Sequence, residues 1–76
     1  MDAKDQALII DNYDHDNELK QLWDEHMEFE RQLEKLDNKP YLSPEEKFEK
    51  KRLQLAKLKG KTRIEEILQR YRSAQT

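Results

Sequence analysis

Cysteine is absent from the 76-residue chain, and glycine occurs only once. Without cysteine, disulfides and thiolate metal sites are excluded, and so is a small secreted fold held together by disulfides. No apolar run approaches the ~20 residues that a membrane-spanning helix requires. The first residues, MDAKDQALIIDNYD, also lack the basic start and the longer apolar stretch of a signal peptide. We therefore expect a cytoplasmic protein without a membrane segment.

Charged residues are abundant, at 42% of the chain, whereas ordinary domains contain ~25%. The net charge of -2 hides an asymmetry, because residues 1–38 carry 12 acidic and 4 basic side chains and residues 39–76 carry 5 acidic and 11 basic ones. Either the two halves attract each other within a hairpin, or the basic half binds an acidic partner such as nucleic acid. The hairpin needs no partner, so it is the leading interpretation.

The first helix is expected over residues 16–37, with Asp14 as its N-cap. Its apolar residues recur at alternating steps of three and four, which places them on a single stripe of a helix. This stripe contains Leu19, Leu22, His26, Phe29, Leu33 and Leu36, and Trp23 borders it. Residues 1–15 are interpreted as a partly ordered arm in which residues 7–10 form either a helical turn or an extended segment.

The second helix is expected over residues 44–72. Pro44 suits the first helical position, and Ser43 and Glu46 form an S-x-x-E capping box. Before it, Asn38 tolerates the left-handed conformation that often ends a helix, and Pro40 disfavours helix at Lys39, so the turn is placed here. The short loop favours antiparallel neighbours, and residues 73–76 are taken as a tail. The predicted fold is all-α: an antiparallel, coiled-coil-like two-helix hairpin that pairs with a second copy into a bundle.

The second helix carries two apolar stripes on nearly opposite sides when its residues are projected at about 100° each. One stripe contains Leu53, Ala56, Gly60, Ile64, Ile67 and Tyr71, with Leu68 beside it, and the other contains Phe48, Leu55, Leu58 and Thr62. A single partner helix cannot cover both stripes. We therefore predict that the protein is a homo-oligomer, because an uncovered apolar face would otherwise remain in water.

Gly60 lies inside the second helix, where glycine costs ~1 kcal/mol relative to alanine. Two explanations are open. The small residues Ala56 and Gly60 could admit the first helix closely, with the indole of Trp23 over the gap. Alternatively, the glycine is simply tolerated at a mild kink.

Candidate chemistry is sparse. His15 and His26 form no metal-ligand pattern with their neighbours, so we expect no metal and no cofactor. No catalytic motif is found, and an enzyme is not expected. His26 is interpreted as a structural or interfacial residue that fixes helix register, with Glu30 as its hydrogen-bond partner; a role as a metal ligand or in proton transfer is the alternative. The candidate phosphate-binding residues are Lys57, Lys59, Lys61 and Arg63.

Two segments carry a family resemblance: EHMEFERQL (residues 25–33) and KLKGKTRIEEIL (residues 57–68). They resemble the YdcH-like family of small bacterial proteins, a domain family of unknown function, over roughly residues 17–70. Thr62 stands where the family usually has Asp, so no role of that acidic residue carries over. The resemblance implies a short helical hairpin in a bacterial cytoplasm, and it implies no established activity, catalytic residue or cofactor.

From these features we expect a non-enzymatic structural or protein-interaction module that acts through helix packing. We expect it to associate with itself and to bind a protein partner, which the sequence does not identify. The alternative is an accessory protein that binds nucleic acid through its basic second helix.

Overall fold

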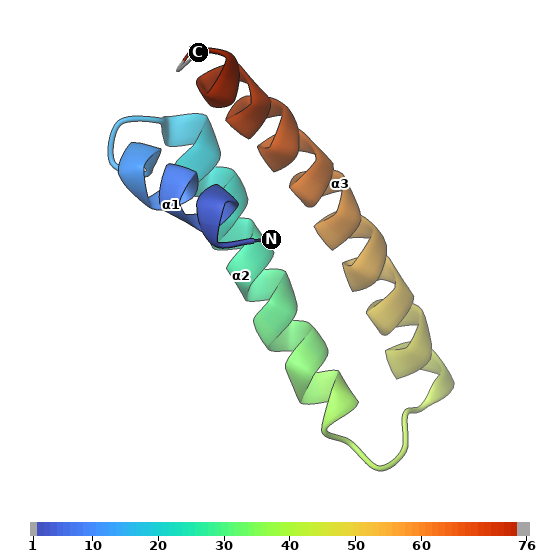
Figure 1. Cartoon of the computed structure of the whole chain (residues 1–76). Coiled ribbons are helices and arrows are strands. Elements are labelled where there is room, and N and C mark those ends of the chain that lie inside the picture. The colour runs from blue at the N-terminus through green and yellow to red at the C-terminus, as the bar shows by residue number, and fades with distance from the viewer. Residues whose placement is uncertain (1, 75–76) are drawn as a thin grey trace.

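Three helices and no strand are formed by residues 2–74, the part of the chain that the computed structural model describes. They are α1 (Ala3–Asn12), α2 (Asn17–Asp37) and α3 (Pro44–Ala74). Helices α2 and α3 lie side by side and antiparallel, and α1 folds back beside the start of α2 (Figure 1). The all-α class and the pairing of α2 with α3 are therefore as predicted. The count of two helices is wrong, because residues 3–12 form a third.

Helix α1 has the local features of a short amphipathic helix. Asp2 is its N-cap, and the Asp2 carboxylate accepts a hydrogen bond from the backbone N–H of Asp5 at 2.9 Å. Its buried residues, Leu8 and Ile9, form an apolar face. At its end, the Asn12 amide donates to the carbonyl oxygen of Leu8 at 2.8 Å. A helix of ten residues is marginal in water, so the packing of this face holds α1 in place.

Helix α2 begins after Asp16, so the prediction of Asp14 as its N-cap is wrong. Asp16 Oδ1 accepts a hydrogen bond from the backbone N–H of Leu19 at 3.0 Å. Its second carboxylate oxygen, Oδ2, accepts one from the hydroxyl of Tyr71, near the end of α3. Asp16 therefore caps one helix and connects it to another, which Asp14 does not do.

The loop between α2 and α3 contains the predicted capping box. Ser43 Oγ accepts from the backbone N–H of Glu46 at 3.1 Å, and Glu46 Oε1 accepts from the backbone N–H of Ser43 at 3.1 Å. Asn38 is the C-cap of α2, and with φ -80° and ψ -8° it is right-handed, so the left-handed conformation that asparagine tolerates is not used here. Its N–H donates to the carbonyl oxygen of Glu34 at 3.0 Å, which continues the helical pattern without a reversal.

Helix α3 continues to Ala74, two residues beyond the predicted boundary, and residues 75–76 of the predicted tail lie outside the described part. Its 31 residues correspond to a length of about 46 Å at 1.5 Å per residue. The longest dimension of the molecule is 49 Å. Helix α3 therefore sets the length of the protein, and the shorter helices pack along it.

The main core lies at the end of the hairpin where all three helices meet. Its buried members are Leu8, Ile9, Leu19, Ile64, Ile67 and Leu68, and Leu22, Trp23 and Tyr71 pack against them. Towards the α2–α3 loop, Leu33 and Leu53 are also buried. Because α1 contributes two side chains to the main core, it is an integral part of the fold.

Candidate interaction surfaces

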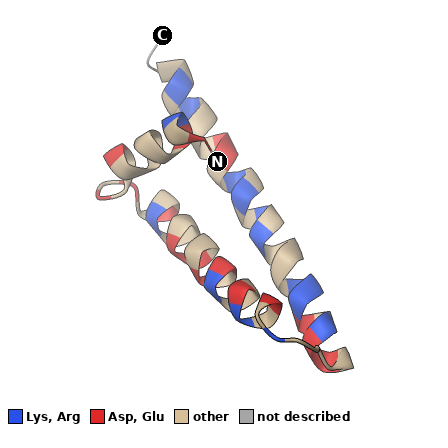
Figure 2. Cartoon of the chain, turned by 60° about the horizontal axis from the view of Figure 1, so that its bottom comes forward, with Lys and Arg blue, Asp and Glu red and all other residues tan. Residues whose placement is uncertain are grey.

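Ion pairs join the acidic helix α2 to the basic helix α3. Glu18 accepts two hydrogen bonds from the Arg63 guanidinium, from Nε and Nη2, each at 3.0 Å. Further along the hairpin, Glu30 lies 3.2 Å from Lys57 Nζ, and Asp37 lies 2.7 Å from Lys50 Nζ. Figure 2 shows most of the basic residues along α3. The opposite charges of the two halves are thus used, in part, within one chain.

The predicted packing residues fall into three groups. Six are buried: Leu19, His26, Leu33, Leu53, Ile64 and Ile67. Six are partly buried: Leu22, Trp23, Phe29, Ala56, Gly60 and Tyr71. Three are exposed: Phe48, Leu55 and Leu58. The first two groups combine the stripe of α2 with the first stripe of α3, whereas the third belongs to the second stripe of α3.

Gly60 does not receive the indole of Trp23. A Cβ atom built on Gly60 would meet nothing within 4 Å, so no close helix approach depends on this glycine. A groove of about 360 Å³ lies here instead, and its lining includes Leu22, Phe29, Ala56 and Gly60. The indole of Trp23 packs on the three-helix core and stacks on His26, with the ring centroids 5.2 Å apart.

His26 is the one buried polar residue among those described, at 8% exposure. Its Nε2 lies 3.3 Å from Glu30 Oε1, the partner expected from the sequence, and its Nδ1 has no hydrogen-bond partner within residues 2–74. Burial lowers the pKa of His26; the Glu30 carboxylate opposes this shift and the Lys57 ammonium adds to it. The neutral imidazole is therefore favoured, which suits a packing residue stacked on Trp23.

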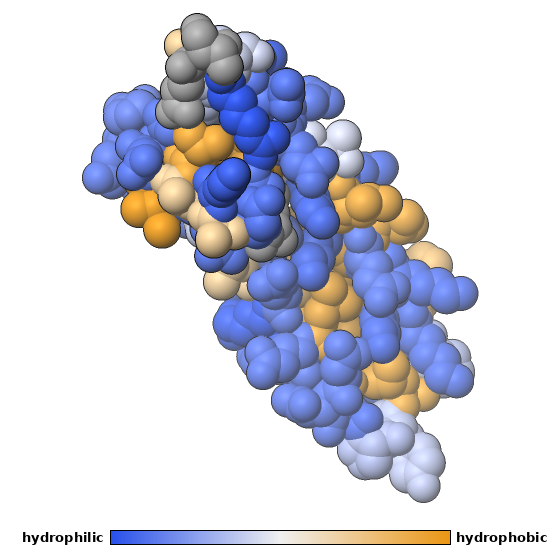
Figure 3. Space-filling view, in the orientation of Figure 1, coloured by the Kyte–Doolittle hydropathy of each residue, from blue (hydrophilic) through white to orange (hydrophobic). Residues whose placement is uncertain are grey.

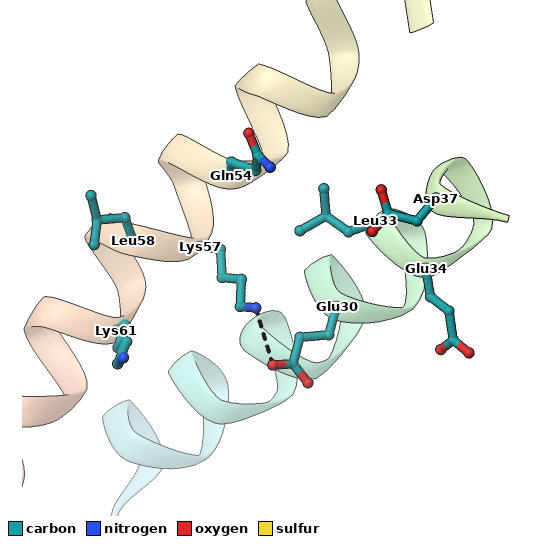
Figure 4. Close-up of a pocket in the computed structure, with 8 residues that line it drawn as sticks. All are labelled: Glu30, Leu33, Glu34, Asp37, Gln54, Lys57, Leu58 and Lys61. Atoms are coloured by element: carbon teal, nitrogen blue, oxygen red, sulfur yellow. Dashed lines mark ion pairs between the residues drawn. The ribbon is translucent and has the colours of Figure 1, made fainter. Parts of the chain in front are cut away.

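A shallow groove of about 570 Å³ separates α2 from α3 near the loop (Figure 4). The ion pair between Glu30 and Lys57 crosses it, and its apolar lining is limited to Leu33 and Leu58. Within residues 2–74, no group of three or more His, Cys, Asp or Glu side chains is placed to hold a metal ion. The groove is therefore lined mainly by charged side chains, of which Glu30 and Lys57 pair with each other.

The outer face of α3 carries large apolar side chains in water. Phe48 is 71% exposed, and Leu55 and Leu58 are each 60% exposed. Phe48 and Leu55 lie seven positions apart on the side of α3 opposite its buried residues, and Leu58 lies three positions further on, at the edge of the groove between α2 and α3. Thr62, the fourth member of this predicted stripe, is also exposed, and its hydroxyl donates to the carbonyl oxygen of Leu58 at 3.0 Å. We call Phe48, Leu55 and Leu58 the α3 stripe.

A second apolar surface, which was not predicted, lies where α1 crosses α2. Ile10 is 73% exposed and Met27 is 47% exposed. Together with Ile9 and Trp23 they line two adjoining hollows of about 390 and 320 Å³. We call these four residues the floor of the α1–α2 groove. Figure 3 shows apolar surface beside α1 as well as along α3. Ile10 and Met27 were visible in the sequence, but only the placement of α1 brings them together.

The four candidate nucleic-acid residues do not form one free basic face. Lys57 and Arg63 are held in ion pairs with Glu30 and Glu18 of α2. Lys59 and Lys61 form no ion pair with any part of the chain that the structure describes.

Comparison with models of protein families, with curated proteins and with solved structures finds no match. None of the helices in the described part of the chain is both long enough and apolar enough to cross a membrane.

Proposed function

We propose that the protein is a small, non-enzymatic interaction module that associates with other copies of itself through helix packing. The observation that carries this proposal is the α3 stripe, in which Phe48, Leu55 and Leu58 are 71%, 60% and 60% exposed. Contiguous apolar surface on a soluble protein is a frequent mark of a protein interface. Phe48 and Leu55 lie on the side of α3 opposite its buried residues, and Leu58 borders the groove between α2 and α3, so the hairpin leaves all three largely in water.

The stripe has the geometry that helix association uses. Leu55 and Leu58 are three positions apart and Phe48 lies seven before Leu55, so they project from one side of the helix, with Lys51 between Phe48 and Leu55. A second helix can receive such side chains between its own. Phe48 also supplies an aromatic anchor of the kind that often dominates binding energy. Removal of these side chains from water is the driving force. The nearby ion pairs between α2 and α3 contribute little, because exposed ion pairs are typically worth ~0–1 kcal/mol.

Self-association is tested by sedimentation equilibrium of the wild-type protein over low to high micromolar concentrations. The disrupting variant is Leu55→Gln/Leu58→Gln, and the matched control is Tyr41→Gln, which replaces another exposed large side chain, in the loop and outside the stripe, by glutamine. We expect the average mass of the wild type and the control to rise with concentration. The stripe variant should remain a folded monomer by circular dichroism. A wild-type protein that stays monomeric throughout would refute the proposal.

A further inference from the structure

The α3 stripe and the α1–α2 groove are apolar surfaces with opposite charges around them. Lys51 lies within the stripe, between Phe48 and Leu55, and Lys47 and Lys59 lie beside it; none of the three forms an ion pair within the described residues. The groove has an acidic rim made by Asp14, Asp24 and Glu30. Along α2 the rim continues with Glu28 and Glu34, which line a neighbouring hollow. Arg31 is the single basic residue in the lining of that neighbouring hollow.

On the rim, Glu30 is paired with Lys57 and Glu28 with Arg31, whereas Asp14 and Asp24 remain available to a partner. Asp14 is exposed and forms no ion pair with residues 2–74. Asp24 accepts a hydrogen bond from the Tyr13 hydroxyl at 2.6 Å, which leaves its negative charge in place. The effect of that charge is seen on Tyr13, whose pKa is raised by the hydrogen bond to Asp24 and by the nearby carboxylates. A basic side chain entering the groove would therefore meet an attractive field.

A symmetric pairing of two α3 helices does not use this complementarity. In an antiparallel pair with Leu55 of one copy beside Leu58 of the other, Arg52 of each copy would lie opposite Lys61 of the second, and Lys47 opposite Glu66. The charges beside such a pair are mixed, so they do not favour this arrangement clearly. This arrangement would also leave Ile10 and Met27 exposed in both copies.

We propose that association is head to tail: the α3 stripe of one copy docks into the α1–α2 groove of the next. This inference rests on the proposed function and specifies its geometry. The lengths agree, since Phe48 to Leu58 spans about 15 Å of helix and the ten residues of α1 also span about 15 Å. In this contact the lysines beside the stripe face the carboxylates of the rim, and both exposed apolar surfaces are covered. Such a heterologous contact produces rings or open chains of copies.

The geometry is tested by mixing two variants that each lack one surface. Leu55→Gln/Leu58→Gln removes the stripe, and Ile10→Gln/Met27→Gln removes the floor of the groove; all four residues are exposed, so both variants should fold as judged by circular dichroism. Head-to-tail docking predicts that each variant alone is monomeric. An equimolar mixture should form a one-to-one dimer and nothing larger, because only one productive contact remains, while the wild type grows beyond a dimer.

Other results separate this inference from the proposed function. If the groove variant associates like the wild type while the stripe variant is monomeric, symmetric α3 pairing is correct and head-to-tail docking is refuted. A mixture that stays monomeric also refutes it. A wild type that is monomeric at every concentration refutes both.

As a second measurement, Lys51→Glu/Lys59→Glu should weaken association about tenfold, and Asp14→Lys/Asp24→Lys in the other copy should recover most of the loss. Failure of the charge reversal to weaken association would contradict the electrostatic part of the docking.

Discussion

Replacement of Ile9 by alanine should remove a large part of the stability of this protein. Ile9 belongs to α1 and is 1% exposed, in a core cluster that also contains Leu19, Ile64 and Leu68. Truncation of a buried isoleucine to alanine costs ~2–5 kcal/mol, from lost apolar burial and from the cavity that remains. A chain of this size is expected to have a total stability of about 4–11 kcal/mol. The variant should therefore lose about half of it.

The adjacent residue provides a matched control. Ile10 lies in the same helix but is 73% exposed, so Ile10→Ala makes the same chemical change without opening a cavity. Both variants gain the same few tenths of a kcal/mol in helix propensity. The difference between them therefore isolates the burial of Ile9. Ile10→Ala should change the free energy of unfolding by less than ~0.5 kcal/mol.

The assay is urea denaturation at low micromolar protein concentration, so that self-association does not add to stability. Circular dichroism at 222 nm follows all the helices, and the fluorescence of Trp23, which packs against the core cluster, follows the end where α1 lies. The two signals should give one transition, at lower urea for Ile9→Ala. If both isoleucine variants unfold like the wild type, α1 is not packed on the hairpin and the three-helix core is refuted.

Three further predictions concern single residues. Gly60→Ala should stabilise the protein by ~1 kcal/mol, because a Cβ atom there meets nothing within 4 Å; a lower midpoint in thermal unfolding would show that glycine is needed. Ser43→Ala should destabilise it by ~1 kcal/mol through loss of the hydrogen bond to the Glu46 N–H, and Ser43→Asp, which can still cap, should retain most of the stability in the same assay. His26 has a lowered pKa in the folded state, so the unfolded chain binds more protons below its ordinary value of 6.5. The contribution of neutral His26 to stability should therefore be fully present above about pH 6.5 and be lost as the pH drops through the lower, folded pKa. In urea titrations at several pH values, His26→Leu should remove this loss. If the free energy of unfolding of the variant still falls with pH, another group is responsible.

The parts of the fold that could be predicted from the sequence depend on local patterns. The alternating steps from Leu19 to Leu36 indicated α2, and the Ser43–Glu46 capping box located the start of α3, because both act between residues less than two turns apart. The charge asymmetry of the two halves correctly indicated their attraction, as the pair between Glu18 and Arg63 shows. The outward direction of the α3 stripe followed from the same helical projection.

The parts that could not be predicted depend on contacts between distant residues. Ten residues are too few to form a stable isolated helix, so α1 exists because Leu8 and Ile9 meet Ile64, Ile67 and Leu68, more than 50 positions later. The choice of Asp16 over Asp14 as a cap follows from Tyr71, which donates to Asp16 from the end of α3. That hydrogen bond and the one from the Leu19 N–H lower the pKa of Asp16. No local pattern distinguishes these two aspartates.

The α1–α2 groove follows from the same long-range packing. Ile10 and Met27 are 17 positions apart, and each alone is an ordinary exposed apolar residue of the kind that most protein surfaces contain. They become one surface only because α1 crosses α2 near Trp23, which lines both hollows with them. A change that detaches α1 should therefore abolish the groove as well as weaken the core.

The basic residues of α3 fall into two sets: those paired with α2, and those beside the α3 stripe. This division is compatible with a chain that folds alone and then associates as proposed. Lys50, Lys57 and Arg63 pair with carboxylates of α2, yet such exposed pairs add little stability, so the buried side chains of the core must provide most of it. The remaining lysines beside the α3 stripe form no ion pair within the described residues. Like charges on one face oppose each other, so these lysines do not favour folding through their mutual interaction. Their clearest physical effect is on the choice of partner, because charge at the edge of an apolar contact sets orientation and specificity more than affinity.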